Sequence, residues 1–353
     1  MAKKLMKGCE ALGEAAIQAG CIHFFGYPIT PQTEVPEYLS RRLPEVGGVY
    51  VQAESEVAAS NMIYGCAATG VRVFTSSSSP GISLMAEAVS YMAGSQLPVV
   101  IVNIVRGGPG LGGILPAQSD YWQATRGIGH GDFRVIVLAP STVQEAADLM
   151  IEAFDIADQY RNPVMIIGDG IIGQMMEPVE FKKREPRKLA EKNWAASGAK
   201  GRAANKIHSL FLDPVKLENH NILLKKKYDE VEKNEQRFEL YNTQKPYELL
   251  IVAYGTMARI CKTSIALLEE ENISIALARP ISLYPYPYQA IKEAARKAKQ
   301  VLVVELSMGQ MIEDVRLAVE GERPIHFYGR SGGMVPSPEE VCRELKRILA
   351  KKP

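Results

Sequence analysis

The chain has 353 residues, of which 46% are apolar and 23% charged, and its formal net charge is +1. This composition is typical of a soluble globular protein with a large core, and the balanced charge gives no electrostatic reason to expect nucleic acid as a partner. No apolar run approaches the roughly 20 residues that a membrane helix needs. We therefore expect a cytoplasmic protein that binds neither nucleic acid nor membrane.

The five cysteines and five histidines are scattered along the chain, without a CxxC pair and without metal-ligand spacing. An odd number of dispersed cysteines argues against a disulfide framework, and the spacing argues against a zinc or iron–sulfur site held by this chain alone. We expect no metal ligand here. Any electron carrier that the reaction needs would then be held by another chain.

Residues 1–180 alternate short apolar runs with helical patterns. The clearest helical pattern covers 142–159 and begins with a capping box, Thr142 and Glu145. This alternation predicts an α/β fold with a doubly wound, mostly parallel sheet, in which ligands bind beyond the carboxyl ends of the strands. The predicted strands are 22–25, 49–53, 71–75, 98–105, 134–139 and 163–168.

The segment after the first strand reads Gly-Tyr-Pro-Ile-Thr-Pro, residues 26–31. Its two prolines stiffen the loop and fix the direction of Thr30. The pattern alone favours a rigid turn in which Thr30 caps the next helix, and leaves a ligand-binding loop as the alternative.

Two more polar segments follow strands. Residues 52–56, Gln-Ala-Glu-Ser-Glu, lead into a helix of small residues, so Glu56 lies near a helix N-terminus. An acid there is ordinarily a favourable partner of the helix dipole. Residues 75–81, Thr-Ser-Ser-Ser-Ser-Pro-Gly, offer hydroxyl and N–H groups to a ligand, or an N-cap for a helix that starts near Gly81.

A glycine-rich stretch, 106–113, follows the strand 98–105. Gly108, Gly110 and Gly113 have the GxGxxG spacing of a dinucleotide-binding turn. Pro116 follows where a helix would have to begin, and no acid ends the next strand, so we reject that interpretation.

What remains is a flexible loop that places Arg106 at the same sheet edge as Thr30 and Glu56. An arginine there suits a bidentate contact with a carboxylate, although a structural acid could also pair with it. His130, in a loop at the same edge, is a possible proton carrier or simply a loop residue.

Residues 168–170, Gly-Asp-Gly, with Asn193 downstream, are similar to the sequence with which thiamine enzymes hold Mg²⁺ and diphosphate. The residues between them do not continue as helix and strand. We interpret Gly168–Gly170 as a turn at the end of the first domain, with metal binding by Asp169 as the lesser alternative.

Residues 181–246 are rich in lysine, arginine and glutamate, and predict a charged linker or arm. We expect one amphipathic helix over Tyr228–Tyr241. The charge favours a solvated connection, and an arm that wraps a partner subunit is the alternative. Residues 247–353 predict a smaller α/β domain, with strands 249–254, 273–278, 301–305 and 325–328 and helices 258–271, 286–298, 309–320 and 338–350.

Four motifs in this order, Gly-Tyr-Pro-Ile-Thr-Pro, Ala-Glu-Ser-Glu-Val-Ala-Ala, Thr-Ser-Ser-Ser-Ser-Pro-Gly and Val-Arg-Gly-Gly-Pro-Gly-Leu-Gly, resemble the alpha subunit of 2-oxoacid:ferredoxin oxidoreductases. The resemblance covers 1–181 and 247–353. Within the family, the chain is most similar to the branched-chain type, which acts on 3-methyl-2-oxobutanoate (2-ketoisovalerate). The types that act on 2-oxoglutarate and pyruvate share the motifs.

The resemblance implies a pyrimidine-binding domain in 1–180 and a transketolase C-terminal-like domain in 247–353, which serves assembly rather than cofactor contact. Thiamine diphosphate would be shared with a beta subunit that carries the diphosphate and Mg²⁺ site and an iron–sulfur cluster. Further small subunits would carry additional 4Fe-4S clusters, and the partners would include small ferredoxin-like and gamma subunits. Coenzyme A would be the co-substrate, ferredoxin the electron acceptor, and the assembly a dimer of heteromers.

The resemblance also gives the candidate residues their roles. Glu56 would hydrogen-bond to the pyrimidine ring nitrogen of the cofactor and so favour its imino tautomer. Thr30 and Arg106 would hold the 2-oxo acid, with Arg106 facing its carboxylate. The remaining cofactor contacts would come from Tyr27, Pro28, Ile29, Ser77 and Ser78.

Two functions outside this class stay open at this point. A nicotinamide-dependent dehydrogenase would rest on the GxGxxG spacing, and a non-catalytic scaffold subunit would need no active-site chemistry at all.

Overall fold

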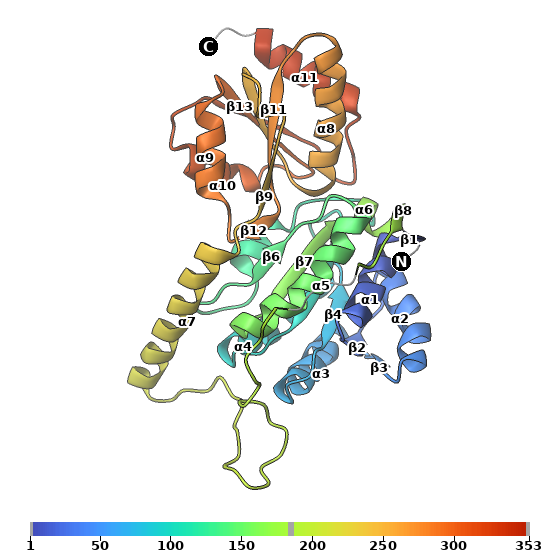
Figure 1. The fold of residues 1–353 in the computed structure, drawn as a ribbon, viewed down its shortest axis with the longest axis vertical. Coiled ribbons are helices and arrows are strands. Elements are labelled where there is room, and N and C mark those ends of the chain that lie inside the picture. Colours follow the sequence, from blue (N-terminus) through green and yellow to red (C-terminus); the bar gives the residue numbers. More distant parts are fainter. Residues whose placement is uncertain (1–2, 183–186, 351–353) are drawn as a thin grey trace.

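The computed structural model describes residues 3–182 and 187–350. The parts of the predicted first domain, arm and second domain that fall on 1–2, 183–186 and 351–353 lie outside the described residues. Two α/β units are stacked end to end, each around its own sheet, and the helix α7 projects along one side of the larger unit (Figure 1).

The larger unit contains a seven-stranded sheet in the order β12-β6-β7-β5-β4-β2-β3. All its strands are parallel except β12, which pairs antiparallel with β6 at one edge. The parallel α/β prediction is confirmed. The strands are β2 (His23–Gly26), β3 (Val49–Gln52), β4 (Phe74–Ser77), β5 (Val100–Val105), β6 (Ile136–Leu138), β7 (Val164–Asp169) and β12 (Ser282–Tyr284).

The predicted strand 71–75 was placed too early. The pairing of β4 with β5 runs through Phe74–Ser77, so the strand ends in serines. The valines at 71 and 73 have the higher strand propensity, but Ser76 and Ser77 pair with β5 and are fully buried, so their tertiary contacts override local propensity.

Helices cover both faces of this sheet. One core cluster packs α1, α2 and α5 against residues such as Phe74 and Val100, and another packs α3 and α4 against Val73 and Ile101, so alternate strand residues serve opposite faces. The helices are α1 (Gly8–Gln18), α2 (Glu34–Glu45), α3 (Glu56–Ala68), α4 (Ser79–Gly94), α5 (Val143–Tyr160) and α6 (Gly170–Gln174), with a π-helical turn at Gln123–Gly127. A two-stranded antiparallel sheet joins β1 (Lys4–Lys7) to β8 (Met176–Val179).

The capping box predicted for α5 forms only in part. The Thr142 hydroxyl accepts from the Glu145 backbone N–H at 3.1 Å. The Glu145 carboxylate instead accepts from the Ser141 N–H and from Arg279 of the second unit, with both guanidinium contacts at 2.8 Å. The start of α5 is therefore bound to the second unit as well as capped.

The smaller unit has a five-stranded sheet in the order β14-β13-β10-β11-β9. Its predicted strands and helices are confirmed to within three residues at each end. α8 and α11 pack on one face, and α9 and α10 on the other. The elements are β10 (Leu249–Val252), α8 (Gly255–Glu270), β11 (Ile275–Pro280), α9 (Tyr288–Arg296), β13 (Gln300–Glu305), α10 (Met311–Val319), β14 (Ile325–Gly329) and α11 (Pro338–Ala350).

The helix predicted over Tyr228–Tyr241 was wrong in both bounds. The helix α7 spans Pro214–Asn234, and Phe238–Tyr241 forms β9, which pairs antiparallel with β11. α7 buries only Leu224, Tyr228 and Val231, so the apolar side chains of its first half are not buried. The pair Asp213-Pro214 was the sequence signal for the start of this helix. Asp213 is its N-cap, and its carboxylate accepts from the Val215 and Lys216 N–H groups.

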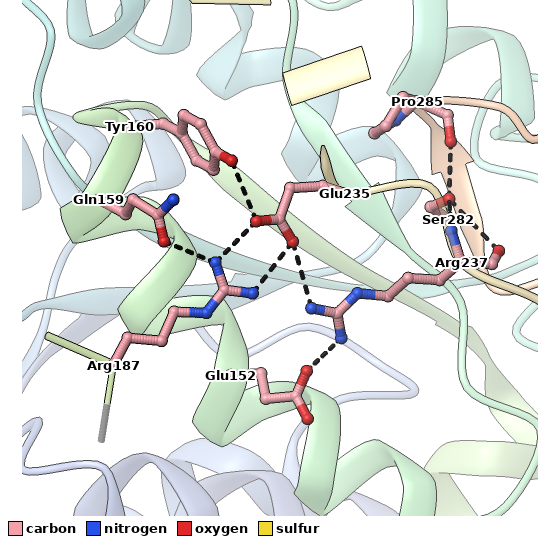
Figure 2. Close-up of polar contacts among 8 residues, drawn as sticks. All are labelled: Glu152, Gln159, Tyr160, Arg187, Glu235, Arg237, Ser282 and Pro285. Carbon is pink, nitrogen blue, oxygen red and sulfur yellow. Dashed lines mark hydrogen bonds and ion pairs between the residues drawn. The ribbon is translucent and has the colours of Figure 1, made fainter. Parts of the chain in front are cut away.

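A buried acid anchors the end of α7 (Figure 2). Glu235 accepts from Arg187 at 2.6 and 3.1 Å and from Arg237 at 3.2 Å. Arg237 also pairs with Glu152 of α5, and its N–H donates to the Ser282 hydroxyl at 2.8 Å. These contacts tie the chain after α7 to α5 and to the start of β12. Among the described residues, no helix is long and apolar enough to cross a membrane.

Candidate active site

The carboxyl ends of β2, β3, β4 and β5 bring four predicted segments to one edge of the larger sheet. The loop 26–31 follows β2, Glu56 opens the helix after β3, the serines follow β4, and Arg106 follows β5. Parallel pairing of these strands makes them neighbours. The edge therefore gathers Thr30, Glu56 and Arg106, as the sequence predicted.

A buried amide holds the loop after β2 in place. Gln32, which is fully buried, donates to the Tyr27 carbonyl at 3.1 Å and accepts from the Ser76 hydroxyl at 2.6 Å. Thr30 is exposed and caps no helix, because α2 begins four residues later at Glu34. The prediction that Thr30 caps the next helix was wrong. The residue is exposed to solvent on a loop that Gln32 holds in place.

Glu56 is the first residue of α3, and its side chain is buried at 5% exposure. Ser55 caps the helix by accepting from the Ala58 N–H at 3.2 Å, so Glu56 is not needed as the cap. Gly81, in the first turn of α4, lies directly against the carboxyl group. A Cβ atom there would be 2.5 Å from Glu56 Oε1 and 2.0 Å from Ser77 Oγ.

The serine segment leaves buried hydroxyls without protein partners. Thr75, Ser77 and Ser78 are fully buried, and their side-chain oxygens make no hydrogen bond within the described part of the chain. α4 begins at Ser79, and the Ser78 side chain does not cap it. Unpaired buried hydroxyls carry a desolvation cost, so they are characteristic of places where a ligand or water completes the bonding.

Arg106 connects two loops at this edge. Its guanidinium donates to the carbonyl of Thr30 at 3.0 Å and to that of Leu111 at 3.3 Å, while its Nε is buried and unpartnered. No carboxylate of the described residues forms an ion pair with it, so it is not held by a structural acid. The backbone N–H of Arg106 donates to the Ser79 hydroxyl at 3.1 Å.

The glycine-rich loop does not form a dinucleotide-binding turn. Gly110 and Gly112 have φ values of 72° and 54°, and a Cβ at Gly112 would lie 1.8 Å from the Gly107 carbonyl oxygen. The segment folds back on itself, with Arg106 bridged to Pro116, and no helix opens after Gly113. The rejection of the GxGxxG interpretation agrees with this geometry.

Two polar residues that the sequence analysis did not single out lie behind Ser79. Asn103, fully buried in β5, accepts from the Ser79 N–H at 3.2 Å and donates to Asp120 at 3.0 Å. Burial raises the pKa of Asp120, and hydrogen bonds from Asn103 and Ser79 oppose that rise. A usable signal was the lone amide in the otherwise apolar run Val-Ile-Val-Asn-Ile-Val.

Asp169, which ends β7 level with Val105 of β5, and His130 make none of the contacts described above. Asp169 caps α6, accepting from the Ile171 and Ile172 N–H groups at 2.9 and 3.2 Å, and burial raises its pKa. His130 packs edge-on against Tyr91, at the far end of α4 from Ser79. No group of three or more potential metal-ligating side chains occurs among the described residues.

Large apolar side chains beside the site are open to solvent. Pro28 and Ile29 are half-buried, and the more exposed side chains are Tyr27, Val57, Leu84, Leu111, Ile114 and Leu115. Leu111 is 84% exposed although its carbonyl binds Arg106. Contiguous exposed apolar groups around polar ones are typical of a surface that another molecule covers.

Comparisons with known proteins agree over the length of the chain. Residues 14–243 match the family model described as "Pyruvate flavodoxin/ferredoxin oxidoreductase, thiamine diP-bdg", and 248–341 match "Pyruvate:ferredoxin oxidoreductase core domain II". The chain is 44% identical over 348 residues to the ketoisovalerate oxidoreductase subunit VorB of Methanothermobacter marburgensis, covering 99% of this chain and 98% of that protein. It is 32% identical to the 2-oxoglutarate synthase subunit KorA of Methanothermobacter thermautotrophicus, covering 97% and 98%.

Solved structures give the same picture. The 2-oxoglutarate:ferredoxin oxidoreductase of Magnetococcus marinus, solved with 2-oxoglutarate, coenzyme A and succinyl-CoA, superposes with a TM-score of 0.87 at 25% identity. The match covers 98% of this chain and spans 65% of that longer chain. A split-gene transketolase in an inactive beta4 tetramer shares the fold, with a TM-score of 0.61 at 15% identity.

Proposed function

This chain belongs to the 2-oxoacid:ferredoxin oxidoreductase family, and on that premise we propose that it is the alpha-type subunit of an enzyme that oxidises a branched-chain 2-oxo acid. The reaction would convert the oxo acid and coenzyme A to acyl-CoA and CO₂ and pass the electrons to ferredoxin. The observation that carries the proposal is the buried carboxyl of Glu56 beside the unpartnered hydroxyls of Ser77 and Ser78, at an edge open to another subunit.

The branched-chain assignment rests on the relatives. Identity to VorB is 44%, against 32% to KorA and 29% to the pyruvate synthase subunit PorA of Pyrococcus abyssi. Enzymes acting on 2-oxoglutarate or pyruvate are the alternatives within the family.

The residues at the sheet edge fit thiamine diphosphate. A buried carboxyl group can accept a proton shared with a ring nitrogen, and orphaned hydroxyls can bond the exocyclic groups of a polar ring. Tyr27, Pro28 and Ile29 would wall this ring. When bound, the cofactor supplies the nucleophilic carbon that attacks the 2-oxo group and stabilises charge as CO₂ leaves.

Each remaining candidate has a task that its position suits. Glu56, whose carboxyl group is buried against Gly81, would hold the proton at the ring nitrogen. Arg106 would bind the substrate carboxylate by exchanging its Thr30 and Leu111 carbonyl contacts for the stronger charged acceptor. Thr30, exposed on the fixed loop, would hydrogen-bond the 2-oxo oxygen.

The missing half of the site would come from partner subunits. We assign the diphosphate and Mg²⁺ site and the iron–sulfur clusters to a beta subunit and smaller subunits, because this chain's described residues hold no such ligand set. The exposed apolar groups around Arg106 would be buried against the beta subunit. In this chain, 1–180 would be the pyrimidine-binding domain, 181–246 the arm and 247–353 the second domain.

Reconstitution tests this proposal. The chain alone should retain little thiamine or iron, whereas the complex with the beta and smaller subunits should hold both. With a viologen acceptor and coenzyme A, the complex should have its highest kcat/KM for 3-methyl-2-oxobutanoate among that acid, 2-oxoglutarate and pyruvate. Full thiamine-dependent activity without this chain would instead make it a scaffold subunit, and a preference for 2-oxoglutarate or pyruvate would contradict the branched-chain assignment.

A further inference from the structure

The second unit forms several hydrogen bonds to the segment just after the glycine-rich loop. Gln118 is 3% exposed; its N–H donates to the Leu306 carbonyl at 2.8 Å, and its side-chain oxygen accepts from the Leu306 N–H at 3.0 Å. Its amide also donates to the Tyr254 carbonyl at 2.9 Å. With the bond that the Tyr254 hydroxyl donates to the Gln118 carbonyl at 3.2 Å, this one glutamine makes four hydrogen bonds to the second unit. They fix its position more strictly than packing alone, because each unpaired group would carry a desolvation cost.

The neighbours of Gln118 are held in the same way. The Gln310 amide donates to the Ser119 carbonyl at 2.7 Å and accepts from the Trp122 N–H at 2.9 Å. The Tyr121 hydroxyl donates to Asp314 at 2.6 Å. Residues 118–122 belong to the connections of the larger sheet, yet they are bound by Tyr254 after β10, by Leu306 after β13, and by Gln310 and Asp314 at the start of α10. We call this segment the clasped segment.

One side chain of the clasped segment turns back into the first unit. Asp120, 8% exposed, accepts from Asn103 at 3.0 Å, and Asn103 accepts from the Ser79 N–H at 3.2 Å. The Ser79 hydroxyl then accepts from the Arg106 N–H at 3.1 Å. The backbone supplies a second route, since Gly107 N–H donates to the Leu115 carbonyl at 3.0 Å and Arg106 bridges to Pro116.

From this continuous chain of contacts we infer that Asp120 is a positioning residue for Arg106, and that the second unit sets the geometry of the substrate-carboxylate site through it. The inference rests on the proposed role of Arg106. It gives the second unit a part in substrate binding that assembly alone would not require. Asp120 itself touches neither substrate nor cofactor in this account.

The physical reason for the coupling is the position of Ser79. This residue is the first of α4, so its backbone N–H is one of the groups that a helix start leaves unpaired, and Asn103 satisfies it. Removal of the Asp120 carboxylate leaves the buried Asn103 amide without its acceptor, and the amide can then rotate away from Ser79. The Arg106 backbone loses a fixed acceptor as a consequence, and its guanidinium loses its direction.

The test is a mutant cycle in the reconstituted complex. Asp120→Ala should raise KM for the 2-oxo acid roughly tenfold, the order expected for one lost buried hydrogen bond, with a smaller change in kcat. If Asp120 acts only through Arg106, Asp120→Ala should change KM by less than about twofold in the Arg106→Ala background. A change of that size is within the usual uncertainty of such a cycle. Ser79→Ala is a smaller perturbation that should raise KM in the same way. It can replace Asp120→Ala if that variant folds poorly.

A matched control separates positioning from general loosening. Tyr121→Phe removes a buried hydrogen bond to the same second unit from the adjacent residue, without a link to Ser79. The contacts of Gln118 and Gln310 still hold the clasped segment in this variant, so it should lower thermal stability and leave KM unchanged. Amide hydrogen exchange should quicken at 106–116 in Asp120→Ala and Ser79→Ala, but not in Tyr121→Phe.

The outcomes distinguish this inference from the proposed function. If Arg106→Ala leaves KM unchanged, the role of Arg106 itself is wrong. Two results would overturn the inference and leave Asp120 with an effect on stability alone. One is that Asp120→Ala raises KM by the same factor with or without Arg106. The other is that Tyr121→Phe raises KM as much as Asp120→Ala does.

Discussion

Gly81→Ala is the sharpest probe of the Glu56 pocket. The added methyl would lie 2.0 Å from Ser77 Oγ, 2.5 Å from Glu56 Oε1 and 3.0 Å from Glu56 Cδ, so these groups must move by an ångström or so. Both are ends of side chains that can rotate, and Gly81 has an ordinary helical backbone. The stability cost should therefore fall at the low end of overpacking, about 1 kcal/mol. A catalytic carboxyl displaced by about 1 Å should lose roughly 100-fold in kcat.

The assay pairs coenzyme A-dependent viologen reduction by the reconstituted complex with thermal unfolding of the chain. Gly65→Ala is the matched control, since its Cβ meets nothing within 4 Å and it lies near the far end of α3, the helix that Glu56 begins. That variant should keep full activity and gain about 0.5–1 kcal/mol of stability from the better helix former. A Gly81→Ala enzyme with the wild-type kcat would refute the placement of the Glu56 carboxyl at the reacting ring.

Three further outcomes follow from the geometry. Arg106→Ala should raise KM for the oxo acid by about 10- to 100-fold with less effect on kcat, and Arg106→Lys should recover only part of this because a point charge cannot bind a carboxylate bidentately; an unchanged KM removes Arg106 from the site. At Glu235, burial opposes the charged form, but Arg187 and Arg237 together outweigh it and hold the pKa below 4.5. This carboxylate therefore stabilises the fold above about pH 4.5 and loses that contribution as pH falls. The difference in Tm between wild type and Glu235→Gln should narrow below pH 4.5, and a constant difference would contradict this. NADH should not quench Trp122 or Trp194 fluorescence, whereas saturable quenching would revive the nicotinamide interpretation.

The sheet edge was predictable because its signals are local. Each of Thr30, Glu56 and Arg106 directly follows a strand that short apolar runs identify, and parallel pairing then makes them neighbours without further information. The second unit was predictable for the same reason, because its strands and helices alternate strictly.

The residues that the sequence did not reveal act through distant contacts. Gln32 and Asp120 lie in segments without regular periodicity, and their partners are 44 and 17 residues away along the chain. α7 was misplaced because its stripe of buried residues covers only part of its length. Asp213-Pro214 marks the start of α7 locally, but its end is anchored by the ion pair Arg187–Glu235, whose partners meet only in the folded chain.

The central claim is that the Glu56 carboxyl activates the cofactor, and Glu56→Gln tests it most directly. The amide keeps the size of the side chain in its buried pocket, so the complex should fold, assemble and retain thiamine diphosphate. The rate of 2-oxo acid decarboxylation should nevertheless fall by about 100- to 10,000-fold, the range that a positioned proton-transfer group contributes. A fully loaded Glu56→Gln complex that decarboxylates at the wild-type rate would contradict the account.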